Sequence, residues 1–175
     1  MPFVGDTFGL NSVYEKQVTN VESNNFASWP ESGTYGYFGG GGNPTRVSTI
    51  TRLDFSNETV SAPGKNLPSV RDGAATVSSS SYGYFGGGSL PPSINTISRL
   101  DFSSETVSNP GKNLLILRQS LSAISGSFNG YFAGGSNPGG NVANLDRLNF
   151  SDETSTNIGS LPTSRASSTG VSNSN

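Results

Sequence analysis

The sequence contains neither cysteine nor histidine. Without cysteine, a disulfide framework and a thiol nucleophile are both excluded. Without either residue, zinc and most copper sites lose their usual ligands, and a Ser-His-Asp triad cannot form. We therefore expect a protein that is not an enzyme, with no catalytic residue, no bound metal and no cofactor.

Charge is scarce as well. Charged residues make up 13% of the 175 residues, the net charge is −2 and no basic cluster occurs, so nucleic acid binding through phosphate contacts is not expected. No stretch approaches the roughly 18 consecutive apolar residues that indicate a membrane span. The amino terminus also lacks the basic and apolar regions of a secretory signal. We expect folding in a cytosol, without membrane insertion.

Hydrophobic residues are only 31% of the chain, below the usual share of a globular domain, and 23 glycines are present. Such a chain cannot bury one large core. It can bury several thin cores if short strands stack face to face. The composition therefore favours an all-β fold made of small sheets.

What the chain has in place of a large core is a repeat of 47 residues. The string YGYFGGG occurs at 35–41 and at 82–88, and NGYFAGG follows at 129–135. Each unit continues with RLDF or RLNF, a polar turn that contains Glu-Thr, and a later arginine. Each also predicts four short strands, since Leu53 and Phe55 alternate with polar residues and turn residues separate the segments. Four strands in each repeated unit is typical of a propeller blade.

The double glycine, the variable stretch after it, RLDF…ET and LP…R occur in an order that resembles the kelch repeat. This resemblance covers 35–175 and implies a kelch-like β-propeller of three four-stranded blades. The chain departs from the kelch pattern at Val60, Val107 and Ser155, where kelch blades usually carry tryptophan. The plug between sheets is therefore expected to be small.

The sequence pattern GYFGGG…ISRLDFSSETVS…LP…R is also similar to repeats in structural proteins of marine tailed bacteriophages that infect cyanobacteria. The resemblance implies a virion protein, such as a tail fibre or another appendage, assembled in the host cytoplasm with other virion subunits as partners.

The repeat predicts an extended N-terminal arm or anchor over 1–34 and blades over 35–81, 82–128 and 129–175. Propellers normally have four to eight blades, and exposed strand edges pair with other strands. We expect the ring to be completed by a second chain, as a homo-oligomer, or by residues outside this sequence. An open stacked array is the third solution.

The arm has two interpretations. It either docks onto a neighbouring subunit or supplies a strand and a plug to the first blade. Its candidate docking residues are Phe3, Val4, Phe8 and Trp29.

Recurring residues are the candidate sites, and we expect structural roles for them. They are Gly39, Gly40, Gly86, Gly87, Gly134, Gly135, Arg52, Arg99, Arg147, Asp54, Asp101, Arg71, Arg118 and Arg165. The glycines permit positive φ and close backbone approach. The run of glycines at 39–42 is not read as a phosphate loop, because neither Lys-Ser/Thr nor a helix follows it.

The arginines and acidic residues each have an alternative role. Arg52, Asp54 and their counterparts are expected to brace a turn, and a cation-binding or acid–base carboxylate triad that includes Glu58, Glu105 and Glu153 is the alternative. Arg71 and its counterparts are expected to donate hydrogen bonds between blades, since a guanidinium reaches several carbonyls at once. Ligand contact is their alternative role.

The loops after the glycines, at 42–48, 89–95 and 136–144, differ between units. They are either plain connectors or a surface that binds a host glycan. The sequence thus predicts a non-enzymatic virion structural protein that assembles with its neighbours. A cellular kelch-type protein-interaction module is the alternative, and a carbohydrate-active propeller enzyme is less favoured. A kelch-type copper oxidase is opposed by the absence of histidine.

Overall fold

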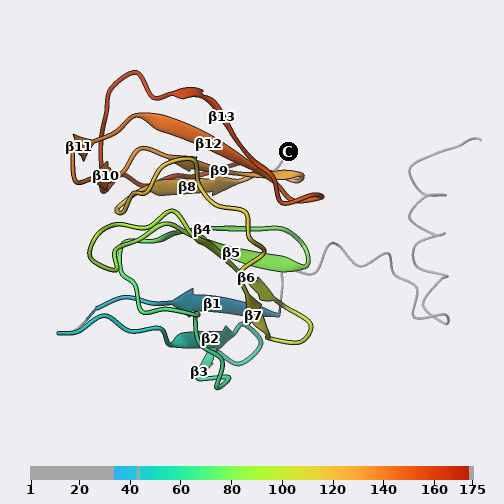
Figure 1. Cartoon of the computed structure of the whole chain (residues 1–175). Helices are drawn as coiled ribbons and strands as arrows, with labels where there is room; N and C mark the ends of the chain where they lie inside the picture. The colour runs from blue at the N-terminus through green and yellow to red at the C-terminus, as the bar shows by residue number, and fades with distance from the viewer. Residues whose placement is uncertain (1–33, 43, 174–175) are drawn as a thin grey trace, which may run out of the picture. The chain divides into compact units, whose positions relative to one another are not determined.

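The computed structural model describes residues 34–42 and 44–173. From Tyr35 onward the chain forms one compact unit of β-strands and loops, with no helix in the part that the structure describes (Figure 1). That part accordingly has no helix suited to crossing a membrane. The predicted all-β class is confirmed. The docking residues expected in the N-terminal arm, Phe3, Val4, Phe8 and Trp29, lie outside the described residues.

Three antiparallel sheets are stacked face to face (Figure 1). The first sheet contains, in spatial order, β1 (Tyr35–Gly39), β2 (Ile50–Asp54) and β3 (Thr59–Ser61). The second contains β4 (Ala75–Ser78), β5 (Tyr82–Gly86), β6 (Ile97–Asp101) and β7 (Val107–Ser108). The third contains β8 (Ser122–Ser125), β9 (Asn129–Ala133), β12 (Asn144–Asn149) and β13 (Ser155–Ser160), and β10 (Ser136–Asn137) and β11 (Gly140–Asn141) form a separate hairpin.

The sheets are offset from the 47-residue units. The strand at the end of one unit, β4 or β8, pairs with the aromatic strand that opens the next unit, β5 or β9. The sheets therefore span 35–61, 75–108 and 122–160, and these spans do not coincide with the expected blades 35–81, 82–128 and 129–175. The reason is local, since residues 79–81 alone join β4 to β5, whereas residues 62–74 separate β4 from β3. A short link favours a hairpin.

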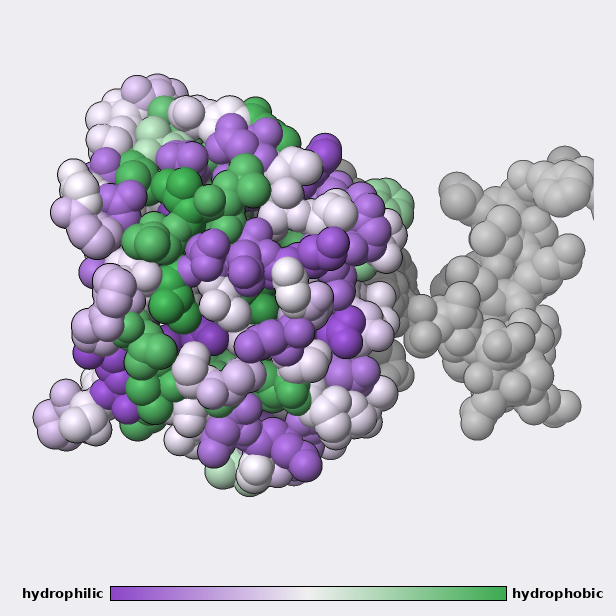
Figure 2. Space-filling view, in the orientation of Figure 1, coloured by the Kyte–Doolittle hydropathy of each residue, from purple (hydrophilic) through white to green (hydrophobic). Residues whose placement is uncertain are grey.

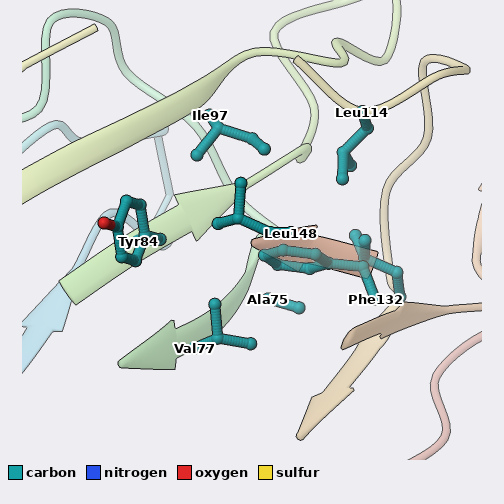
Figure 3. Close-up of a cluster of buried hydrophobic side chains, with 8 residues drawn as sticks. Ala75, Val77, Tyr84, Ile97, Leu114, Phe132 and Leu148 are labelled. Carbon is teal, nitrogen blue, oxygen red and sulfur yellow. The ribbon is translucent and has the colours of Figure 1, made fainter. Parts of the chain in front are cut away.

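Two thin cores lie between the sheets. Successive side chains of a strand point to opposite faces, so Phe85 packs toward the first sheet and its neighbour Tyr84 toward the third. The larger core joins the second and third sheets, and Figure 3 shows Tyr84, Ile97, Phe132 and Leu148 converging there. The second sheet is thus covered on both faces.

The C-terminal segment, residues 167–173, belongs to the third 47-residue unit but joins no sheet among the described residues. The amide of Ser167 donates to the carbonyl of Ser120 at 2.7 Å, as the amide of Ser120 donates to that of Gly73 at 2.7 Å. The segment therefore lies against β8 as β8 lies against β4. No closed ring of sheets forms among residues 34–42 and 44–173.

Candidate functional site: the contacts between sheets

The same three polar side chains join each sheet to the next. The hydroxyl of Tyr37 and Nη1 of Arg52, in the first sheet, both donate to Oε1 of Glu105 beside the second, at 3.0 and 2.9 Å. One sheet further on, Tyr84 and Arg99 donate to Oε1 of Glu153 at 3.1 and 2.9 Å. We call this arrangement the clamp.

Burial and the glutamate together keep the clamp tyrosines protonated. The pKa of Tyr37 is raised to about 12, first by burial and then by its hydrogen bond to Glu105. The pKa of Tyr84, which is fully buried, is raised further, first by burial and then by the charge of Glu153. Both phenols therefore act as hydrogen-bond donors at neutral pH.

Aromatic rings accompany each clamp. Tyr37 stacks on Phe102 of the next sheet with ring centroids 5.5 Å apart, and Tyr84 stacks on Phe150 at the same distance. The guanidinium of Arg99 lies over the ring of Tyr82, 4.7 Å from its centroid. The stacked rings thus lie beside ion pairs that stay partly exposed, since the paired side chains are 18–30% exposed.

The two outer sheets each carry half of a clamp. Tyr131 and Arg147 occupy the donor positions in the third sheet, and Glu58 occupies the acceptor position beside the first. These three side chains have no hydrogen-bond partner among the described residues, although Glu58 has the same left-handed φ, 57°, that Glu105 has at 53°. The sequence predicts that Arg52 and Arg99 brace a turn, whereas they pair with a glutamate of the next sheet, and sequence reasoning overlooked the tyrosines. The signal was the 47-residue spacing of Tyr37, Tyr84 and Tyr131.

Arg71 and Arg118 are buried and hold adjacent sheets together. Arg118 donates to the carbonyls of Phe132 and Asn144 and pairs with Asp146 at 3.1 Å, with both charged side chains fully buried. Arg71 donates to Oγ of Ser98 at 3.0 Å and to two carbonyls, without a carboxylate partner among the described residues. Burial lowers the pKa of both guanidinium groups, although Asp146 opposes this for Arg118.

Arg165, the third member of that series, is exposed. Its Nε donates only to the nearby carbonyl of Thr163, at 3.3 Å. The difference follows from position, because no fourth sheet lies beyond it within the described residues.

The backbone carbonyl groups of these arginines pack directly against the paired glycines. A Cβ at Gly40, Gly87 or Gly134 would lie 2.5 Å from the carbonyl oxygen of Arg71, Arg118 or Arg165 in turn. All three glycines have positive φ, between 62° and 75°. The amides of the glycines that follow, Gly41, Gly88 and Gly135, each donate to that same oxygen at 2.8–2.9 Å. Gly39 and Gly86 instead seat the rings of Phe85 and Phe132.

The acidic residues at the ends of β2 and β6 brace the turns that follow. Oδ1 of Asp54 accepts from the amide and hydroxyl of Ser56 at 2.8 and 2.6 Å, and Asp101 accepts from Ser103 in the same way. These hydrogen bonds lower the pKa of both carboxyls. No group of three acidic residues suited to a metal ion occurs in the described ranges.

The variable loops lie together at one end of the sheets, at the left of Figure 1. Arg46 of the first loop contacts Asp72 at 3.1 Å and donates to Oγ of Ser89 in the second at 3.3 Å. In the third loop, Asn137 accepts from the amide of Gly139 at 2.8 Å. Figure 2 shows apolar side chains exposed among polar ones on the face drawn there.

These features define an all-β protein whose antiparallel sheets are held in a stack by repeated side-chain contacts. Among the solved structures that match is the structure of YjhT, with a TM-score of 0.65 and 11% identity, over 77% of this chain. The match spans 51% of the YjhT chain, about half its length. At this identity the likeness concerns the fold alone, a propeller-like arrangement of sheets. No protein-family model and no curated protein matches the sequence.

Proposed function

We propose that the chain is a kelch-like propeller segment that serves as a non-enzymatic structural subunit of a phage virion, in a tail fibre or another appendage. The observation that supports a scaffold role is the use of the recurring charged residues. Arg52, Arg71, Arg99 and Arg118 all bind groups of the adjacent sheet. Side chains committed to holding sheets together serve assembly and not a reaction.

The virion assignment rests on the resemblance of the repeat to cyanophage structural proteins, and it has a direct test. Cyanophage particles from a host whose phage encodes this sequence are purified by density gradient and digested for peptide mass spectrometry. We expect peptides of this chain at a constant ratio to the other structural proteins. Peptides found only in the infected-cell lysate, and never in particles, would contradict the assignment.

We also propose that the variable loops bind a neutral host glycan. Thr45, Leu90 and Asn141 are exposed on these loops, which differ between units while the sheets beneath them stay alike. Rigid scaffolds commonly present recognition residues in this way.

The glycan proposal is tested on an array. The protein with alanine at Thr45, Leu90 and Asn141 is expected to lose a signal that the unaltered protein gives. A control with alanine at Ser80 and Ser127, exposed in turns at the opposite ends of the strands, should keep it. The absence of binding by the unaltered protein would end the glycan proposal and leave the scaffold role standing.

A further inference from the structure

The two outer faces of the stack carry the complementary halves of the contact that joins the sheets inside it. The third sheet presents Tyr131 and Arg147, the donors of a clamp, and the exposed Arg165 follows it in the chain as the counterpart of the buried Arg71 and Arg118. The first sheet presents Glu58, the acceptor, and Phe55, the counterpart of the stacked rings Phe102 and Phe150. Phe55 is 52% exposed, whereas its two counterparts are partly buried against their neighbours.

The first sheet has a free edge at β1 among the described residues. There β1 pairs with β2 alone, whereas β5 and β9 each pair on both sides. A groove runs beside β1, lined by residues 35–37 on one wall and by residues 76–78 of β4 on the other. It continues between residues 39–41 and 71–74. An extended strand would fill this groove as β4 fills the corresponding place beside β5.

The C-terminal segment has the sequence for that strand. Residues 169–172 read Thr-Gly-Val-Ser, against Ala-Thr-Val-Ser in β4 and Ser-Ala-Ile-Ser in β8. Val171 is 92% exposed, whereas its counterpart Val77, covered by the next sheet, is 3% exposed. The competing residues of the same chain, 28–31, read Ser-Trp-Pro-Glu, and Pro30 has no amide hydrogen for a ladder.

We propose that the occupant of both faces is a second copy of this chain, so that two copies joined head to tail close a ring of six sheets. The C-terminal segment of each copy enters the groove beside β1 of the other, with Val171 opposite Tyr37, the register that Val77 and Tyr84 have within one chain. Glu58 of one copy then contacts Tyr131 and Arg147 of the other across the interface between the copies, which we call the seam. A head-to-tail interface closes when its rotation permits, and half of the YjhT chain is left unmatched by one copy.

The seam differs from the internal contacts at one residue. Gly39 and Gly86 seat phenylalanine rings, and a Cβ at Gly39 would lie 2.6 Å from the ring of Phe85. The third sheet has Ala133 in the equivalent position, where Phe38 of a second copy would dock. Phe38 must therefore shift outward there, which makes the seam the loosest contact of the ring.

This inference deepens the proposed scaffold role, on which it rests, by naming its partner and its residues. Light scattering after gel filtration of the full chain should give twice the 18.1 kDa mass of one chain. Glu58→Arg and Arg147→Glu should each weaken association by about tenfold or more through like-charge contact. Mixing the two variants restores opposite charges at both seams, so the mixture should associate again.

Two further variants test the strand and the seam. Val171→Asp should abolish association, whereas Ile158→Asp, at another exposed apolar residue, should leave it unchanged. Ala133→Gly should tighten it. Each variant must keep the β-sheet circular dichroism of the parent.

A mass of one chain at every concentration up to the solubility limit would overturn the inference, as would a mass of three or more chains. Association that survives both charge reversals would overturn the interface. Detection of the chain in purified virions does not depend on any of these results. Failure of the ring is therefore distinguishable from failure of the proposed function.

Discussion

Arg99 and Glu153 form an ion pair 2.9 Å long although 54 residues separate them in the chain. The pair is half-buried, since the two side chains are 30% and 18% exposed, and Oε1 of Glu153 also accepts from the buried hydroxyl of Tyr84. One carboxylate thus receives two donors from the adjacent sheet. This is how a chain with few hydrophobic residues holds its sheets in register.

Replacement of a glutamate by glycine should separate the strain of the turn conformation from the stabilisation that the clamp contributes. Glu58, Glu105 and Glu153 all have positive φ, between 53° and 58°, which costs roughly 1 kcal/mol for a residue with a side chain. Glu153→Gly leaves the hydroxyl of Tyr84 unpaired and should lower the free energy of unfolding by about 1–3 kcal/mol. Glu58→Gly, with no partner in the described part of the chain, should be neutral or raise it slightly. Urea unfolding at protein concentrations below the association range measures both, and equal losses at 58 and 153 would refute the clamp.

Gly87→Ala should be far more damaging than Gly111→Ala. Both glycines have positive φ, 67° and 80°, but a Cβ at Gly87 would lie 2.5 Å from the carbonyl oxygen of Arg118, whereas one at Gly111 would meet nothing within 4 Å. Gly111→Ala should therefore lose only the backbone term, about 1–2 kcal/mol. Gly87→Ala should lose more than about 3 kcal/mol, since backbone atoms must move. Thermal unfolding monitored by circular dichroism compares them, and similar midpoints would contradict the close packing.

Arg118→Met should destabilise the protein more than Arg71→Met. Removal of Arg118 leaves the buried carboxylate of Asp146 without its ion pair, a loss of about 3–5 kcal/mol. Arg71 binds neutral acceptors only, so its replacement should cost about 1–3 kcal/mol.

The double change Arg118→Met with Asp146→Asn tests the electrostatic part of that loss. It removes the isolated charge and should recover part of the stability, as measured by denaturant midpoints. Failure of the second substitution to recover any stability would show that packing, and not charge, explains the loss.

Acid should weaken the protein through the turn aspartates. Hydrogen bonds from Ser103 and Ser104 lower the pKa of Asp101 below its ordinary value of 3.8. A lowered folded-state pKa gives stability that is present above pH 3.8 and is lost as the pH falls through the lowered value. Asp101→Asn should flatten the dependence of the unfolding midpoint on pH below about 4.

Asn149 shows that the amide fits this position. It occupies the same place in the third sheet and accepts from the amide and hydroxyl of Ser151 at 2.8 and 2.9 Å. Asn149→Asp is therefore the reverse control and should steepen the acid dependence. Parallel pH profiles for Asp101→Asn and the parent would rule out this linkage.

The sequence by itself determined the all-β class, the strand segments and the positions of the recurring arginines and glycines. These follow from local chemistry: the alternation of Leu53 and Phe55 with polar residues specifies a strand, and Gly40 and Gly87 permit a backbone conformation that other residues rarely adopt. Each such pattern occurs in all three repeats, so patterns that are weak when taken singly were enough to predict the strands.

Only the tertiary structure decided which strands share a sheet and which partners the repeated charges take. Arg118 and Arg165 occupy the same position of the 47-residue repeat, but the first is buried against Asp146 and the second is exposed. Likewise Glu58 and Glu153 adopt the same turn, yet of these two only Glu153 contacts a tyrosine and an arginine within the described residues. Burial and pairing depend on what the next sheet supplies, and a repeated local pattern carries no information about whether a next sheet is there.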